Sequence, residues 1–339
     1  MEKRIELAHG AGGILMDELI KNVIIPKFSL RTAGGVGLDD LDDGASIPVG
    51  DYEIVISTDA HTVDPIFFPG GDIGKLAVAG IINDVSVMGA RPIAITSAMV
   101  LEEGFPISDL EKILASMAQT AEEVGVALIS GDTKVVPRGQ VDKIIITTTG
   151  VGIVKRGHII KDSGLKPGDK IIITGTIGDH GIALLAKREG LEFETELKSD
   201  VAPIWETINA ALSVGGITAM KDPTRGGVAA ALVDMAEKSK VSIWIEEDAL
   251  PIREEVQAAA EMLGIDPLEV TNEGKAVIGV SNDKAEEVLD AIRKTKYGRN
   301  AAIIGEVKAE KPGYVLVRTS IGGTRILEKP YGEPIPRVC

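Results

Sequence analysis

GGDIGKLAVAGIINDVSVMGARP, at residues 70–92, carries the signals of a helix at both of its ends. Asp72 stands where a carboxylate caps a helix, and Gly89 stands where a helix that runs to about Met88 ends. Asp84 lies inside this helix among apolar residues, where an ionised carboxylate needs a partner or a metal ion. Because about 18 Å of helix separates the two carboxylates, one ion cannot bind both. We predict a capping role for Asp72 and a functional role for Asp84.

The rest of the first half of the sequence predicts four strands and a second helix. Ser108 and Glu111 form a predicted capping box before a helix that ends near Gly125. Apolar runs between glycine-rich turns predict four strands, at residues 53–58, 93–101, 126–130 and 143–154.

The second half alternates strands with helices, which predicts an α/β layered domain. The predicted strands are residues 170–174 and 242–246, and the predicted helices are 182–188, 202–214, 224–238, 253–263 and 284–294. The ending EKPYGEPIPRVC carries three prolines, which favours an extended, mobile tail. We therefore expect an N-terminal domain at 1–155, a C-terminal domain at 156–327 and a tail at 328–339.

Composition excludes several classes of partner. The formal charge of -15 would repel a phosphate backbone, and aromatic residues make up only 3% of the chain, so nucleic acid is not expected. No stretch reaches the roughly 20 apolar residues of a membrane helix, and the first residues lack the apolar core of a signal peptide. With a single cysteine, no disulfide can form within the chain. We expect a soluble cytoplasmic protein that binds no membrane.

Acidic residues recur at strand ends and in glycine-rich turns, at Asp42 and Asp43, Asp59, Asp84 and Asp132. Hard Mg²⁺ ions favour such oxygen ligands and bridge them to substrate phosphates. For any one of them, a turn former or a helix cap is the ordinary alternative. Neither a P-loop nor a G-x-G-x-x-G fingerprint is present, so a nucleotide would have to bind in another way.

Two glycine-rich turns carry candidate phosphate contacts. Lys134 follows Gly131, Asp132 and Thr133 in an expected turn after a strand, where a lysine can meet phosphate oxygens, although a solvated surface lysine is equally compatible with the spacing. KDPTRGG, at residues 221–227, leads into a predicted helix whose first N–H groups would favour an anion, with an ordinary helix start as the alternative.

Four more residues are candidates for chemistry or for ligand contact. Glu273 in TNEGK is a candidate general base, and His9 lies in HGAGG, a loop that could fold over a ligand as a lid. His180 in GDHG is expected to be a helix-start residue. Cys339 ends the predicted tail, from which a thiolate can accept an acyl-like group and present it to another site.

Nine stretches together resemble the HypE family of [NiFe]-hydrogenase maturation nearly end to end. They are HGAGG, DDGA, STDAHTV, FFPGGDIGKLA, NDVSVMGARP, SGDTKVV, DPTRGG, TNEGK and the terminal PRVC. The family belongs to a PurM-like set of ATP-using enzymes that includes aminoimidazole ribonucleotide synthetase, selenophosphate synthetase and thiamine-monophosphate kinase. The acidic motifs alone would identify only that set.

The resemblance implies an α+β fold of two domains. It implies an N-terminal α+β domain that forms a β-barrel across a homodimer, an α/β C-terminal domain, and ATP in the cleft between them. By position in the motifs it places Asp43, Asp59, Asp84 and Asp222 with Mg²⁺ and phosphate. It places the nucleotide near Asn83, Gly131, Asp132, Thr133 and Lys134.

The resemblance also implies an activity, which is the ATP-dependent dehydration of a carbamoyl group on Cys339 to a thiocyanate, with Lys134 and Glu273 handling that group. The carbamoyltransferase HypF would load the cysteine, and a HypC–HypD pair would accept the cyanide. Two alternatives stay open: a small-molecule kinase or synthetase of the same fold, and a non-catalytic acidic scaffold that binds Mg²⁺ and docks a partner through its terminal thiol.

Overall fold

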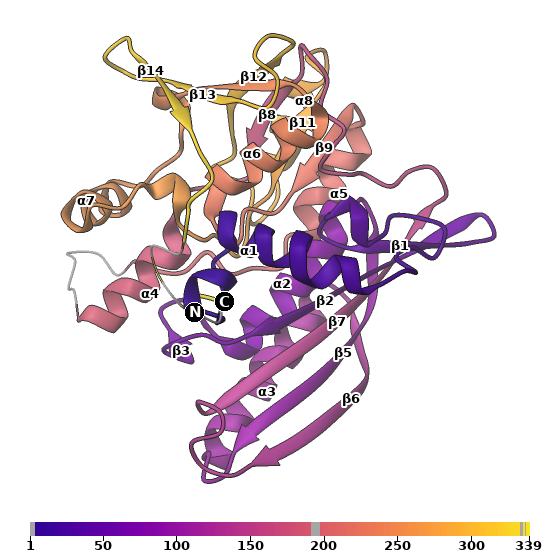
Figure 1. The fold of residues 1–339 in the computed structure, drawn as a ribbon, viewed down its shortest axis with the longest axis vertical. Coiled ribbons are helices and arrows are strands. Elements are labelled where there is room, and N and C mark those ends of the chain that lie inside the picture. The colour runs from indigo at the N-terminus through magenta and orange to yellow at the C-terminus, as the bar shows by residue number, and fades with distance from the viewer. Residues whose placement is uncertain (1–3, 191–196, 333–334, 336) are drawn as a thin grey trace.

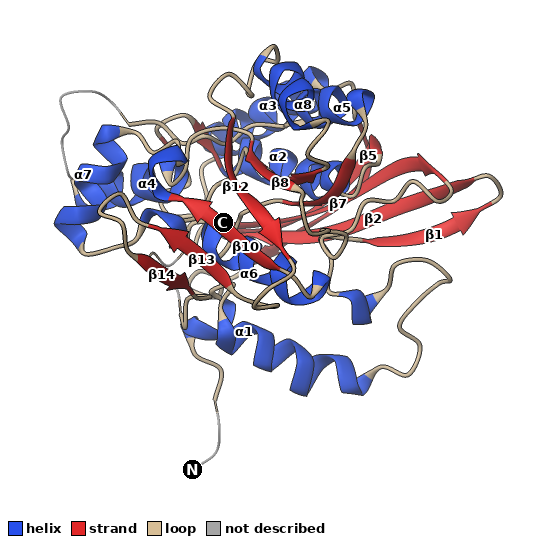
Figure 2. Ribbon diagram, turned by 90° about the horizontal axis from the view of Figure 1, so that it is seen from above, coloured by secondary structure: helices blue, strands red, loops and turns tan. Residues whose placement is uncertain are grey.

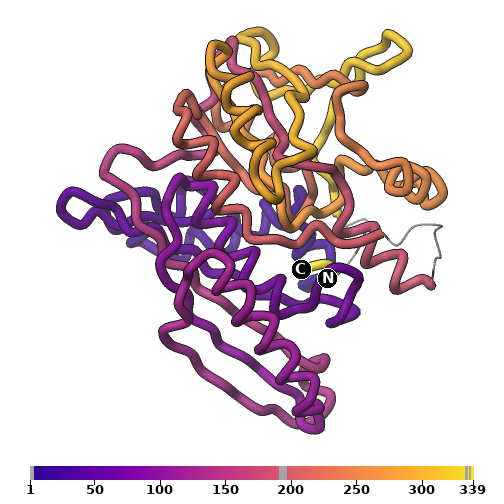
Figure 3. Tube along the Cα trace, turned by 180° about the vertical axis from the view of Figure 1, so that it is seen from behind, coloured from indigo at the N-terminus to yellow at the C-terminus, as the bar shows by residue number. Residues whose placement is uncertain are grey.

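The computed structural model describes residues 4–190, 197–332, 335 and 337–339, and it contains two large β-sheets that are both covered by helices (Figure 1). One sheet comes from the first half of the chain and the other from the second half. The chain end lies at the junction of the two halves, as the yellow end of the tube in Figure 3 shows. The α+β class is confirmed.

The first sheet is antiparallel except for one parallel pair at its edge, β5 with β6. Its strands in spatial order are β1 (Ala45–Val49), β2 (Tyr52–His61), β7 (Ile144–Lys155), β5 (Arg91–Glu102) and β6 (Ala127–Val136). Two short strands, β3 (Phe67–Phe68) and β4 (Gly71–Asp72), form a separate hairpin before the first long helix. Figure 2 shows β1, β2 and β7 extending away from the second sheet.

Helix α2 (Ile73–Val87) is the buried helix predicted from the opening stretch, and it packs on the first sheet. Its cap is confirmed, because Asp72 accepts hydrogen bonds from the N–H groups of Gly74 and Lys75 at 2.7 and 3.0 Å. A side chain on Gly152 of β7 would collide with Val85, since its Cβ would stand 2.3 Å from Cγ1 of that valine. Glycine on β7 therefore sets how closely the helix approaches the sheet.

The second sheet mixes parallel and antiparallel pairs and has helices on both faces. Its strands in spatial order are β14 (Thr324–Leu327), β13 (Val315–Arg318), β10 (Ser242–Glu246), β12 (Ala302–Lys308), β8 (Lys170–Ile173), β11 (Val277–Val280) and β9 (Ile217–Lys221). Helix α6 (Gly227–Ser239) covers one face, and α5 (Trp205–Val214) and α8 (Ala285–Arg293) cover the other. Helices α4 (Asp179–Glu189) and α7 (Glu254–Leu263) lie beside this sheet.

Two predictions about local structure are wrong. Helix α3 (Ile107–Glu123) begins after Pro106, and no side chain caps it, so Ser108 and Glu111 form no capping box. Strand β6 does not end near residue 130 but continues to Val136, because β5 offers a parallel partner along its whole length. Lys134 therefore lies on a strand and not in a turn. Strands β1, β3, β4, β9 and β11–β14 were not predicted.

The N-terminal segment and the start of the predicted tail hold each other in place. Helix α1 (Ile14–Leu19) follows the HGAGG loop, and the N–H of Ile14 donates to the carbonyl of Pro330 at 3.1 Å. Lys329 forms ion pairs with Asp17 on α1 and with Asp234 on α6, at 2.9 and 2.6 Å. Of the predicted tail, residues 333–334 and 336 lie outside the described residues. Among the described ranges, no helix combines the length and the apolar character needed to cross a membrane.

Candidate functional site

Five of the predicted carboxylates converge where the two halves of the chain meet. Asp59 lies on β2 and Asp84 on α2, Asp43 lies in the loop before β1, Asp222 directly follows β9, and Glu273 lies in the loop before β11. These elements are far apart in the sequence, so only the fold brings the carboxylates together.

Burial and neighbouring carboxylates raise the pKa of three of these groups. Burial, with Asp222, Asp59 and Asp43 close by, raises the pKa of Asp84 well above its ordinary value. Burial, with Asp43 nearby, raises the pKa of Asp222 to about 8. Burial, with Asp222 and Asp59, likewise raises the pKa of Glu273 well above its ordinary value. This concentration of acidic groups favours either bound protons or a cation.

Several oxygens of the cluster have no hydrogen-bond partner among the residues that the structure describes. They are Oδ2 of Asp43, Oδ2 of Asp222 and Oε1 of Glu273, all buried. Asp84 has a partner, because its Oδ2 lies 2.8 Å from Oγ of Ser57. Buried acceptors without partners are expected where a ligand or an ion belongs.

This donor set suits Mg²⁺ in its chemistry, since all the atoms are hard carboxylate oxygens. Within the described part of the chain, however, no three acidic, histidine or cysteine side chains are gathered closely enough to hold a metal ion as they stand. Lys221 partly neutralises the group, because its Nζ lies 2.7 Å from Asp43. A magnesium ion would have to displace that ion pair or bind beside it.

A second ion-pair group adjoins the first and was not predicted. Asp162 is buried and pairs with Lys221 at 3.4 Å and with Lys238 on α6. Burial, with Asp43 and Asp162, raises the pKa of Asp42 to about 7. Lys221 was predicted as part of an anion-binding turn, but its side chain is engaged with these carboxylates.

Asn83 is placed inside the protein and holds the loop of Glu273. Its Nδ2 donates to the carbonyls of Ala202 and Glu273 at 3.0 and 3.1 Å, and its Oδ1 accepts from the N–H of Ile204. Both amide hydrogens are therefore used. The structure gives Asn83 a supporting role, and its contact with a nucleotide stays a prediction.

Residues 131–134 do not reach the acidic cluster within one chain. A single row of paired residues crosses the sheet through Asp59, Thr148, Ser97 and Gly131. Three strand spacings separate its ends, or about 14 Å. Lys134 lies further along β6, its side chain is 70% exposed, and its ion-pair partner among the described residues is Asp132, at 3.4 Å. Gly131, Asp132, Thr133 and Lys134 thus share an exposed edge strand, apart from Glu273.

His61 was missed by the sequence analysis, although it lies in the STDAHTV stretch. It is fully buried at the end of β2, and its Nε2 lies 3.3 Å from Oδ2 of Asp59. Burial lowers the pKa of His61, against the opposing effect of Asp59. A Cβ on Gly80 of α2 would stand 3.0 Å from Nε2 of His61 and 3.8 Å from Oε2 of Glu273. Glycine at position 80 thus lets both side chains lie against the helix.

The end of the tail lies in the same region. The hydroxyl of Thr62, the residue after His61, makes a long hydrogen bond of 3.5 Å to the carbonyl of Cys339. Cys339 is partly buried and packs against a large apolar cluster that both halves of the chain contribute to, and in which Val338 is buried. The structure therefore shows the tail inserted, with Cys339 in contact with the neighbour of the site's buried histidine.

His180 begins a helix as expected, since it is the second residue of α4, but it also contacts the tail. Its Nε2 lies 2.7 Å from the carbonyl of Val338. This contact joins residues 158 positions apart, and no pattern in the sequence signals it.

The HGAGG loop packs against protein and not over an open site. A Cβ on Gly12 would stand 2.4 Å from Cβ of Arg225, and one on Gly13 would stand 2.1 Å from the carbonyl oxygen of Pro330. The loop therefore lies between the DPTRGG turn and the root of the tail. His9 is held locally, because its Nδ1 accepts from the N–H of Glu6.

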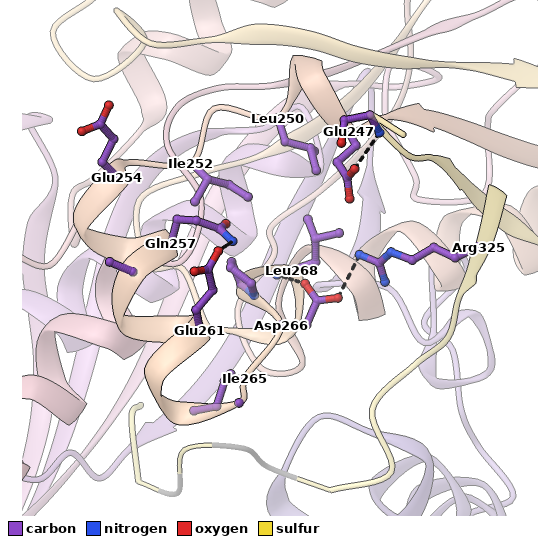
Figure 4. Close-up of a pocket in the computed structure, with 14 residues that line it drawn as sticks. Glu247, Leu250, Ile252, Glu254, Gln257, Glu261, Ile265, Asp266, Leu268 and Arg325 are labelled. Carbon is purple, nitrogen blue, oxygen red and sulfur yellow. Dashed lines mark hydrogen bonds and ion pairs between the residues drawn. The ribbon is translucent and has the colours of Figure 1, made fainter. Parts of the chain in front are cut away.

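A cavity of about 950 Å³ lies away from these residues. Figure 4 shows it between α7 and the strand of Arg325, with an ion pair of 2.9 Å between Arg325 and Asp266. Leu250 and Leu268 line it. None of the predicted site residues does, so its size does not mark it as the active site.

The AIR synthase related proteins match this chain over most of its length. Their N-terminal domain matches residues 41–154 and their C-terminal domain matches residues 166–318. A putative hydrogenase expression/formation protein of Methanocaldococcus jannaschii is 52% identical over 338 residues, covering 99% of this chain and 100% of that protein. The carbamoyl dehydratase HypE of Cupriavidus necator is 44% identical over 340 residues, covering 99% and 95%.

Two solved structures have the same fold. A chain of a HypE–HypF complex superposes with a TM-score of 0.86 at 44% identity, covering 92% of this chain and 99% of that one. A HypE structure in complex with ATP superposes with a TM-score of 0.82 at 40% identity, covering 99% and 100%.

Proposed function

The chain belongs to the HypE family of carbamoyl dehydratases in hydrogenase maturation, and from that premise we propose that it dehydrates an S-carbamoyl group on its own Cys339 to a thiocyanate with cleavage of ATP. One observation carries the assignment of the cysteine. The tail is inserted with Cys339 beside Thr62, next to His61, and both His61 and Glu273 lie against Gly80.

ATP is the proposed source of the phosphoryl group, and a relative of the same fold binds it. Asp43, Asp59, Asp84 and Asp222 are the proposed ligands of Mg²⁺, which, when bound, supplies positive charge for the phosphates. The buried oxygens of Asp43 and Asp222 that lack a hydrogen-bond partner among the described residues support this assignment. Because burial raises the pKa of Asp84 and Asp222, cation binding at these two carboxyl groups would release protons.

In the proposed reaction, Glu273 removes a proton from the carbamoyl nitrogen as the carbamoyl oxygen attacks the γ-phosphorus of ATP. The P–O bond to ADP breaks, and an O-phosphorylated imidate forms on sulfur. Loss of the second nitrogen proton then breaks the C–O bond, which releases phosphate and leaves C≡N on Cys339. A raised pKa makes the ionised form of Glu273 a stronger base than an ordinary carboxylate.

Lys134 is proposed to act on the group from a second copy of the chain. Within one chain it lies on the exposed edge of the first sheet, apart from Glu273. Leu128, Ile129 and Val135 on that same strand are 54%, 64% and 66% exposed. An unpaired apolar edge strand is suited to pair with another. We propose a homodimer in which β6 helps to close a barrel and carries residues 131–134 of each copy to the other's cleft.

HypF and the HypC–HypD pair are the proposed partners. A structure of a HypE–HypF complex supports the first of them. Each transfer requires Cys339 to leave the inserted position, so we also propose that the tail from residue 328 moves, with residues 1–155 and 156–327 as separate domains.

The decisive experiment measures the mass of the C-terminal peptide after incubation with HypF, carbamoyl phosphate and ATP, and again after fresh MgATP. We expect a carbamoyl adduct on Cys339 that loses one water only when ATP can be cleaved. Cys339→Ala should show neither mass change while retaining ATP binding. Continued ATP turnover beside an unmodified cysteine would instead identify an enzyme that acts on a free small substrate.

A further inference from the structure

We infer that His180 is a positioning residue for the tail. It acts through a hydrogen bond to the main chain of the tail and does not contact the group carried on sulfur. His180 is fully buried, and its ring bridges the loop of Ser199 to the carbonyl of Val338. The inference rests on the proposed function only for its consequence in catalysis. The docking itself can be measured without ATP or a carbamoyl group.

The hydrogen bonds around the ring fix which nitrogen carries the proton. The carbonyl of Val338 can only accept, so Nε2 of His180 must donate across the 2.7 Å contact. Burial lowers the pKa of His180, which favours the neutral ring, so Nδ1 accepts. The hydroxyl of Ser199, 2.7 Å from Nδ1, then donates, and its oxygen accepts from the N–H of Val201 at 3.0 Å. Every group in the chain of contacts is satisfied.

Neighbouring contacts on the tail follow the same pattern. The carbonyl of Arg337 accepts from Nη2 of Arg188 at 3.1 Å and from the N–H of Asp64 at 3.2 Å. Three successive main-chain oxygens, of residues 337, 338 and 339, are therefore held by groups from both halves of the chain. Val338 adds an apolar anchor, since its side chain is 1% exposed.

The tail is therefore held at two places: at its root, Lys329 and Pro330, and at its tip, residues 337–339. Lys329 and Pro330 hold the root through α1 and α6, and His180 holds the tip. For the tail to leave this docked position, the contacts of residues 337–339 must break while those of Lys329 and Pro330 remain. The hydrogen bonds to residues 337–339 are made to main-chain oxygens. The tail should therefore depend on His180 for docking to the same extent whether Cys339 carries a free thiol, a carbamoyl group or a cyano group.

The test compares the rate at which iodoacetamide alkylates Cys339 in the full chain with His180→Ala, His180→Gln and His180→Asn. Loss of the buried hydrogen bond in His180→Ala should raise the rate roughly tenfold. Glutamine places an amide N–H near the position of Nε2 and should restore most of the protection. Asparagine reaches only to the position of Nδ1 and should behave like alanine. His158→Ala, at an exposed position, is the matched control and should match wild type.

Equal alkylation rates in wild type and all four variants would overturn the inference. Thermal melting of each variant shows whether it is folded, and the contrast between glutamine and asparagine distinguishes positioning from a general loss of structure. With the carbamoylated chain, His180→Ala should also slow dehydration while leaving ATP affinity unchanged. If His180 protects Cys339 but the wild-type chain does not dehydrate the group, the proposed function fails and the docking inference stands.

Discussion

At the scale of single residues, the site depends on carboxyl groups that the fold buries against one another. Glu273 is held by its backbone, since its carbonyl accepts from Asn83 and its N–H donates to Asp200 at 3.1 Å. Its Oε1 is buried without a hydrogen-bond partner. A carboxyl group that is fixed in place and has a raised pKa is suited to exchange a proton with a bound group.

Replacing Glu273 with glutamine should therefore slow dehydration by about a hundredfold or more, because the amide keeps the size of the side chain but cannot accept the proton. The measurement is a single turnover of the carbamoylated chain, followed by mass. ATP affinity should change little. Glu269→Gln, four residues earlier, is the control, and a wild-type rate for Glu273→Gln would remove this residue from the mechanism.

The raised pKa of Asp222, about 8, predicts a pH dependence of stability in the metal-free protein. As pH rises from about 4 to 8, the unfolded carboxyl loses its proton while the folded one keeps it, so the free energy of unfolding falls. The amide that replaces this carboxyl in Asp222→Asn cannot titrate. Relative to wild type, Asp222→Asn should therefore gain about 3–4 kcal/mol between pH 5 and pH 8.

Thermal or urea unfolding in EDTA at the two pH values measures this difference. Asp248→Asn, at an exposed position, serves as the control for the loss of one negative charge. A difference between Asp222→Asn and wild type that stays constant with pH would show that Asp222 is ionised in the folded protein throughout.

At the scale of elements, α2 carries Asp84 toward the cluster only because β7 lets it approach. The inward-facing positions of β7 include Gly150 and Gly152, whose missing side chains make room for the helix. On the helix, Gly80 makes room for His61 and Glu273 in the same way. Close packing of the helix on the sheet thus positions the site, and a side chain at Gly150 or Gly152 would force its neighbours to shift.

Gly152→Ala should lower the free energy of unfolding by about 1–3 kcal/mol, because the added methyl group would overlap Cγ1 of Val85. Denaturant unfolding measures the change. Gly10→Ala is the control, since nothing lies within 4 Å of the position of its added Cβ. Unchanged stability of Gly152→Ala would mean that α2 can move away from the sheet freely.

At the scale of the whole molecule, the proposed homodimer can be tested at the exposed edge of β6. Ile129→Lys places a charge on that edge and should shift the protein from dimer to monomer in analytical ultracentrifugation. Ser130→Lys on the same strand is a matched control for charge at a position that is polar in this chain. A dimer that survives Ile129→Lys would have to form through another surface.

Mixing two inactive variants tests where Lys134 acts. In a heterodimer of Lys134→Ala with Cys339→Ala, a lysine that serves the partner's cysteine restores one of the two sites, so an exchanged equal mixture should recover about a quarter of the wild-type activity. A lysine that serves its own chain restores none. Each variant alone is the control, and continued inactivity of the mixture would place Lys134 and Cys339 in one chain.

The sequence by itself determined those features that depend on residues close together in the chain. The cap at Asp72, the alternation of strands and helices and the motif set predicted α2, the α+β class and the family, because caps and periodicity act within a few residues. It could not give the length of β6, which depends on pairing with β5, or the absence of a cap at Ser108.

Only the tertiary structure decided the site. It gathered Asp43, Asp59, Asp84, Asp222 and Glu273 from both halves of the chain, added His61 and His180, and separated residues 131–134 from them. The physical reason is that burial and charge coupling depend on distances between segments that lie far apart in the sequence. Such distances are set when sheets and helices pack, and no local pattern in the sequence records them.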